Sequence, residues 1–186
     1  CSRRMTTRKR ILMRSSGAAG EIVLNGMKTL KRKVHGLLSR NDGQAFPEEI
    51  LGYPLKRVVN PLFSYIQSSD ERIKARAVAA MGKVVAALAD QEMERGRIVM
   101  RRLMWSLNDE SGGIGWGAPE AMGEIMAEHD GLAREFHKIL ISYVDSRGNY
   151  LEYAPLRQGA VLGLKRLFKA RPRLMAPYAE LLGTLG

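Results

Sequence analysis

The chain has 186 residues and a formal net charge of +11 at pH 7, and only 6% of its residues are aromatic, so alanine, leucine and methionine must do most of the packing. This composition favours helices over strands, and the length suits one domain or a short repeat array. A single cysteine, Cys1, excludes an internal disulfide framework, and no apolar run approaches the ~18 residues that span a bilayer or forms a signal-peptide core, so we expect a cytoplasmic protein.

The positive charge is concentrated at the N-terminal end. Eleven of the 30 Lys and Arg residues lie within residues 1–40, which contain one acid, Glu21, whereas the rest of the chain is nearly neutral. Residues 1–16 carry six of these cations and no sustained helical periodicity. We expect them to form a flexible basic arm, which is either simply solvated or binds nucleic acid or a membrane surface.

The remainder, residues 17–186, is expected to form a single domain that begins with a helix. Apolar residues at Val23, Met27, Leu30 and Val34 fall on one face of a helix over residues 20–39. Two prolines and two glycines then mark residues 40–54 as a connection, within which a short helix could start at Pro47.

A repeat organises the rest of the chain. The apolar spacing i, i+3, i+4, i+7, i+8 occurs three times, starting at Ala77, Ala118 and Ala160, which are 41 and 42 residues apart. Each copy follows another apolar helical stretch, starting in turn at Val59, Met100 and Phe136. Three matching pairs at one period predict helix pairs over about 53–89, 92–129 and 131–170, followed by a capping helix over 172–184.

These pairs resemble HEAT-type repeats. The stretch DERIKARAVAAMGKVV (70–85) resembles the second helix of that family, and APEAMGEI (118–125) is similar to the variant called PBS-lyase HEAT-like. The longer run LNDESGGIGWGAPEAMGEI is similar to small uncharacterised bacterial HEAT-like proteins. The chain departs from the pattern at Gly115 and Gly117, where a basic residue is usual, and at Lys165, which replaces a glycine. The resemblance implies an all-α, right-handed α-solenoid of about three pairs with terminal capping helices.

The glycine-rich stretch around Trp116 joins the two helices of the middle pair. It follows no strand and lacks the GxxxxGK[ST] order, so it is not a P-loop or dinucleotide fingerprint. Two interpretations stay open. The glycines either permit a tight turn with positive φ, over which Trp116 packs, or hold the backbone close to a ligand or partner, with Trp116 as an anchor.

An insertion points to a binding edge. In each pair, we count from the last apolar residue of the first helical stretch to the first apolar residue of the second. This separation is 11 residues in the first two pairs and 17 in the third, so about six extra residues lie within 145–156. Corners of this kind project from the same edge of a solenoid. The 108–117 and 145–156 corners should therefore form one rim, although its tyrosines could instead only cover the end of the core. The predicted rim residues are Asn108, Asp109, Glu110, Trp116, Asp145, Arg147, Tyr150 and Tyr153.

Glu120, Glu124 and Glu128 form an acidic stripe at helical spacing. A carboxylate pair for acid–base catalysis is one interpretation, and the other is a ladder in which Lys83, Glu124 and Arg166, which occupy equivalent repeat positions, pair across neighbouring helices. The three histidines share no metal-ligand spacing. We therefore expect no metal and no cofactor.

The function favoured at this point is a non-enzymatic scaffold that binds a protein partner through the rim. The alternative is a nucleic-acid-binding protein, and one form of this alternative is a base-excision enzyme similar to alkylpurine glycosylases built on HEAT-like repeats. Such enzymes use aromatic residues and a carboxylate on a basic face, and Trp105 and Asp109 have suitable spacing. The nearly neutral body argues against it, because duplex binding depends on phosphate neutralisation.

Overall fold

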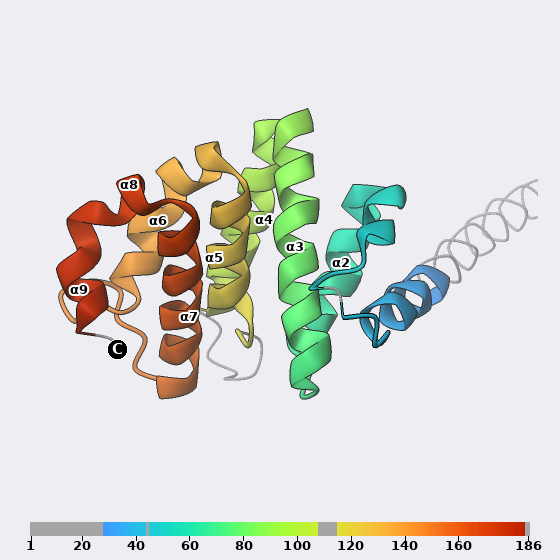
Figure 1. The fold of residues 1–186 in the computed structure, drawn as a ribbon, viewed down its shortest axis with the longest axis horizontal. Coiled ribbons are helices and arrows are strands. Elements are labelled where there is room, and N and C mark those ends of the chain that lie inside the picture. The colour runs from blue at the N-terminus through green and yellow to red at the C-terminus, as the bar shows by residue number, and fades with distance from the viewer. Residues whose placement is uncertain (1–27, 44, 108–114, 185–186) are drawn as a thin grey trace, which may run out of the picture.

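The computed structural model describes residues 28–43, 45–107 and 115–184. Over these ranges the chain is built from helices and turns, with no strand (Figure 1). The prediction of an all-helical chain is therefore confirmed for this part of the sequence. None of the described helices is long and apolar enough to cross a membrane.

Each apolar template lies on one helix of a consecutive pair. The first pair is α2 (Leu55–Tyr65) and α3 (Glu71–Gln91), the second is α4 (Met93–Leu107) and α5 (Ala118–Glu128), and the third is α6 (Asp130–Ser142) and α7 (Ala154–Ala170). The helices α3, α5 and α7 lie side by side, and α2, α4 and α6 lie behind them (Figure 1). Helix α5 packs against both α3 and α7 and is the centre of the molecule.

The template residues of α3, α5 and α7 form the centre of the core, except Phe168, which was expected on the buried face and is 36% exposed. Their alternation of small and long side chains lets neighbouring helices approach while the long side chains fill the layer between them. The fully buried members on α3, α5 and α7 are Ala77, Ala80, Met81, Val84, Val85, Ala121, Met122, Ile125, Met126, Ala160, Leu164 and Leu167.

Side-chain caps fix the start of two helices. The Asp70 carboxylate accepts hydrogen bonds from the backbone N–H groups of Arg72 and Ile73, at 2.9 and 3.1 Å, and so caps α3. His129 caps α6 in the same way, because its Nδ1 accepts the backbone N–H of Leu132 at 3.1 Å. The single residue His129 thus ends α5 and starts α6.

The glycine-rich corner shortens α5. Helix α3 begins six residues before Ala77 and α7 begins six before Ala160, whereas α5 begins at Ala118 itself. Gly117, the residue before it, has a φ of 74°, and a Cβ there would overlap the carbonyl oxygen of Ile66 at the end of α2. The predicted positive φ is thus present at Gly117, where only glycine combines this conformation with such close packing.

The N-terminal end of the described chain is held by one buried arginine. Residues 28–38 are helical, and the Arg76 guanidinium on α3 donates to the carbonyl oxygens of Leu37 and Arg40, at 3.3 and 2.7 Å. It also donates to both carboxylate oxygens of Asp42, at 2.6 and 3.2 Å. Arg76 therefore caps the end of one helix from the side of another.

Two segments that were expected to be single α-helices have a different structure. The expected short helix after Pro47 is a 3-10 turn, η1 (Glu48–Gly52). The expected capping helix over 172–184 is divided into α8 (Pro172–Met175), η2 (Ala176–Tyr178) and α9 (Ala179–Gly183). Pro177 explains the break, because it cannot donate a backbone hydrogen bond and its ring clashes with the preceding turn.

Candidate functional site

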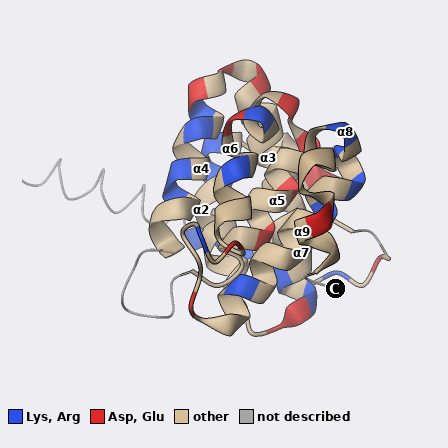
Figure 2. Cartoon of the chain, turned by 90° about the vertical axis from the view of Figure 1, so that its left-hand side faces the viewer, with Lys and Arg blue, Asp and Glu red and all other residues tan. Residues whose placement is uncertain are grey.

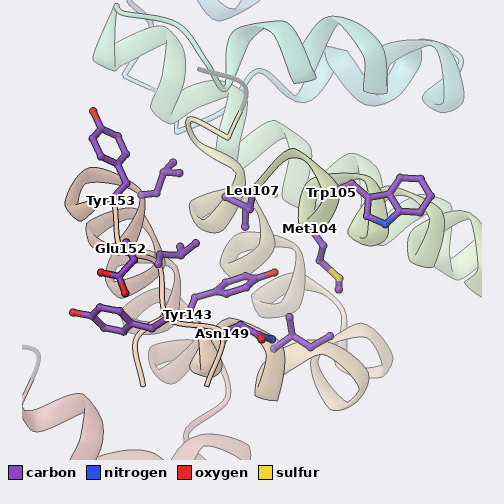
Figure 3. Close-up of a pocket in the computed structure, with 11 residues that line it drawn as sticks. Met104, Trp105, Leu107, Tyr143, Asn149, Glu152 and Tyr153 are labelled. Carbon is purple, nitrogen blue, oxygen red and sulfur yellow. The ribbon is translucent and has the colours of Figure 1, made fainter. Parts of the chain in front are cut away.

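A groove opens between the end of α4, α6 and the connection from α6 to α7. Its volume is about 760 Å³, and Figure 3 shows Met104 and Trp105 on one side, Glu152 and Tyr153 on the other, and Tyr143 between them. Pockets of about 300–1,000 Å³ accommodate small ligands or a few side chains. The lining residues are Met104, Trp105, Leu107, Ile139, Tyr143, Asn149, Tyr150, Leu151, Glu152, Tyr153 and Leu156.

The rim of the groove exposes large aromatic surface. Trp105 is 71% exposed and Tyr153 is 51% exposed. Tryptophan and tyrosine side chains are enriched at interfaces, where their rings become buried. The floor is different, because Tyr143 is only 5% exposed. Burial raises the pKa of the Tyr143 phenol to about 12. The groove is therefore apolar at its base and aromatic at its edges.

The connection that forms one wall is folded on itself. It spans residues 143–153 and is six residues longer than the corresponding connection, residues 66–70, between α2 and α3. The Asp145 carboxylate accepts a hydrogen bond from the backbone N–H of Arg147 at 3.0 Å, which closes a turn. The backbone N–H of Leu151 donates to the carbonyl oxygen of Tyr143 at 3.1 Å.

Arg157, in the first turns of α7, fastens this connection. Its guanidinium donates to the carbonyl oxygens of Leu151 and Glu152, at 2.7 and 3.1 Å, and lies 4.8 Å from the ring centroid of Tyr150. One side chain thereby fixes both the backbone and an aromatic ring of the groove wall. Sequence reasoning missed Arg157, because its partners are main-chain carbonyls, which leave no pattern in the sequence.

The two predicted corners meet at one aromatic pair. The rings of Trp116 and Tyr153 are 5.7 Å apart between centroids, and their planes are inclined by 88°. This is the edge-to-face geometry that aromatic pairs prefer. The expected proximity of the corners is thus present, and Trp116, which is half-buried, supports Tyr153 from outside the groove.

The other predicted rim residues are distributed unevenly. Tyr150 and Tyr153 line the groove. Asp145 and Arg147 do not line it and instead form an ion pair with each other, 3.1 Å apart. Asn108, Asp109 and Glu110 lie outside the described residues. Sequence reasoning treated Met104, Ile139 and Tyr143 as core positions and missed their part in the groove, since helical periodicity shows which face is apolar but not where that face is left uncovered.

The acidic stripe is occupied by ion pairs. Arg166 Nε lies 2.8 Å from Glu124 and its Nη2 lies 2.9 Å from Glu128, so the predicted pairing of α5 with α7 is confirmed. The predicted pairing of Lys83 with Glu124 is wrong, because Lys83 Nζ contacts Glu128 at 2.5 Å. Gly82 packs against Glu124, whose carboxylate turns to Arg166, and the lysine therefore reaches one turn further.

The third member of the stripe also has a basic partner. Glu120 lies 3.2 Å from Lys74 Nζ on α3. Ion pairs of the stripe thus join α3, α5 and α7.

The histidines serve as structural groups. His129 is a helix cap, His137 Nδ1 lies 2.9 Å from the carbonyl oxygen of Ala133, and the His35 ring lies 5.5 Å from that of Tyr65. Over the described ranges, no three His, Cys, Asp or Glu side chains are placed to hold a metal ion together.

Three of the four arginines of α4 are matched by acids, whereas Arg102 donates to Asn60 and lies over the ring of Phe63. Figure 2 shows several Lys and Arg segments along α4. Arg97 lies 2.6 Å from Glu135 on α6, Arg95 lies 2.6 Å from Glu92, and Arg101 pairs with Glu94. Hydrogen bonding to the Arg97 guanidinium holds the pKa of Glu135 below its ordinary range. The charges of Arg95, Arg97 and Arg101 are thus offset within the chain, which makes these three arginines poorly suited to gather phosphates.

Comparison with known proteins gives no relative from which a role could be transferred. No protein-family model, curated protein or solved structure matches the chain.

Proposed function

We propose that the helix pairs form a right-handed α-solenoid of the HEAT type, with the residues before α2 and after α7 as caps. The support is the 41- and 42-residue repeat of the apolar template together with the side-by-side packing of α3, α5 and α7. In such an array each pair buries its apolar face against its neighbours, so the corners between helices lie along one edge.

We further propose that the protein is a non-enzymatic interaction module that acts in the cytoplasm and binds a segment of a protein partner in the groove. The observation that carries this proposal is the pair of exposed rings, Trp105 and Tyr153, at the edges of an apolar groove. Exposed tryptophan and tyrosine beside a concave apolar surface are the usual energetic anchors of an interface. The ion pairs of Arg95, Arg97 and Arg101 on α4 make nucleic acid the weaker alternative.

A peptide library displayed against the full chain tests the proposal. Selected peptides should bind the wild type, and Trp105→Ala or Tyr153→Ala should each weaken binding at least roughly ten-fold, because hot-spot truncation costs about 2 kcal/mol or more. Leu162→Ala is the matched control, since Leu162 is 55% exposed on α7 and does not line the groove.

Two further outcomes would count against the groove. Peptides that bind all three variants equally well would place the interaction elsewhere. Duplex DNA that binds at low salt and shifts the amide resonances of α4 would favour the nucleic-acid alternative. Arg147→Ala shows whether the contact extends to the tip of the 143–153 connection, where the Arg147 side chain is 87% exposed.

A further inference from the structure

The charge of the groove contrasts with the charge of the chain. Among the groove-lining residues that the structure describes, Glu152 alone is charged, and none is Lys or Arg. No ion pair or hydrogen bond engages the Glu152 carboxylate within the described part of the chain, whereas the nearest arginine, Arg157, is already bonded to two carbonyl oxygens and stacked on Tyr150. The groove thus offers one free anion and no competing free cation.

The aromatic rim adds sites for positive charge. The electron-rich faces of indole and phenol rings attract Lys and Arg side chains that lie within about 6 Å. Trp105 and Tyr153 expose much of their rings at the two edges of the groove, with Glu152 beside Tyr153 (Figure 3). The occupant that fits is therefore a short apolar segment with basic residues on both sides.

One segment of the chain itself has this composition. Residues 8–14 read RKRILMR, in which Ile11, Leu12 and Met13 are flanked by four cations and no acid occurs before Glu21. Three consecutive apolar side chains match a groove of about 760 Å³ with an apolar base. Cations on both flanks would meet Glu152 and the exposed rings.

A tether of 13 residues, 15–27, joins the segment to residue 28, where the described chain begins. It would span about 45 Å if fully extended, and about 30 Å with residues 20–27 in the helix expected over residues 20–39. A short tether also gives an effective concentration in the millimolar range, so a weak contact is sufficient for occupancy.

We propose that residues 8–14 occupy the groove of the same chain and compete there with the external partner. The inference rests on the proposed function, since it regulates access to that same groove. A partner must then displace the segment, and its apparent affinity is reduced by the fraction of molecules in which the groove is filled. Loss of the segment's apolar residues relieves this competition.

Cys1, the single cysteine of the chain, allows a direct test in the 186-residue chain. A nitroxide attached to Cys1 should broaden the amide resonances of Leu107, Asn149 and Leu151 when residues 8–14 occupy the groove. Leu12→Asp or Glu152→Lys should restore the intensity of these resonances. Glu180→Lys, an exposed change of the same kind on α9, should leave the broadening intact.

The possible results separate the two proposals. Groove resonances that keep their full intensity in the labelled wild type, or broadening that survives Leu12→Asp, would overturn the inference. Broadening that appears only when labelled chain is mixed with unlabelled, isotope-enriched chain would place the segment in a second copy and would overturn it as well. If library peptides still bind in a Trp105-dependent way, the proposed function stands without this regulation; if they do not, both proposals fail.

Discussion

Gly123 on α5 and Gly163 on α7 face each other so closely that a Cβ atom on Gly123 would overlap the Cα of Gly163. The contact is reciprocal, because a Cβ on Gly163 would lie 2.6 Å from the carbonyl oxygen of Pro119. The backbones of two neighbouring helices therefore touch, with no side chain between them. This seam sets the spacing of α5 and α7, and with it the position of the connection that forms the groove wall.

Gly123→Ala should lower the free energy of unfolding by about 1–3 kcal/mol, because the added methyl forces the two helices apart. This loss exceeds the gain of about 1 kcal/mol that alanine brings to a helix interior. Gly36→Ala is the control, since Gly36 lies in the helical residues 28–38 and a Cβ there would meet nothing within 4 Å. Urea melts should show Gly123→Ala destabilised and Gly36→Ala unchanged or stabilised; equal effects would contradict the close contact.

The sequence predicted which faces of the helices are buried but not how far neighbouring helices slide along each other. Ala80 and Ala121, small residues of the repeated apolar spacing, are both fully buried. Gly82 and Gly123, two residues further along each helix, lie so close to Glu124 and Gly163 that neither position has room for a Cβ. Apolar spacing defines an angular position around a helix, whereas the axial offset depends on how side chains of two helices interlock.

The same axial offset explains the ion pairs, and it can be measured. A double-mutant cycle of Lys83→Met with Glu128→Gln should show a coupling of about 0.5–1 kcal/mol, the range of partly exposed pairs. The cycle of Lys83→Met with Glu124→Gln should show a smaller coupling, since Lys83 is linked to Glu124 only through Glu128 and Arg166. Coupling in the second cycle but not in the first would restore the pairing expected from repeat alignment.

The candidate site was less predictable than the fold. Trp116 and Tyr153 could be placed together from the inserted length of one corner, because connections on the same edge of a helix array are neighbours. The groove itself could not, because it depends on Ile139 being left partly exposed beside the buried Tyr143 and on Arg157 bonding to main-chain carbonyls. Neither feature has a signature in residue spacing.

Tyr143 should make the protein less stable in strong alkali. Burial raises its pKa to about 12 in the folded state, whereas an unfolded tyrosine titrates near 10. Between these values the unfolded chain releases a proton that the folded chain keeps, so stability falls as the pH rises from about 10 to 12, by up to about 2–3 kcal/mol. Tyr143→Phe should remove this part of the pH dependence in urea melts, and an unchanged slope would show that the phenol is not protected.

Arg157 should control the order of the groove wall rather than the stability of the core. Arg157→Met removes the donors to the carbonyl oxygens of Leu151 and Glu152 and the cation over Tyr150. We expect the free energy of local opening to fall by about 1–2 kcal/mol, which corresponds to roughly ten-fold faster hydrogen exchange at the Leu151 amide.

Arg147→Met is the matched control, because within the described residues the Arg147 side chain bonds to Asp145 of its own turn and is 87% exposed. It should leave the Leu151 amide, which donates to the carbonyl oxygen of Tyr143, as protected as in the wild type. Since an ordered wall reduces the entropy lost on binding, Arg157→Met should also weaken the capture of library peptides, although it changes no exposed anchor. Faster exchange with unchanged capture would mean that peptides contact the α4 side of the groove alone. Unchanged exchange in Arg157→Met would show that the connection is held by its own turn and not by α7.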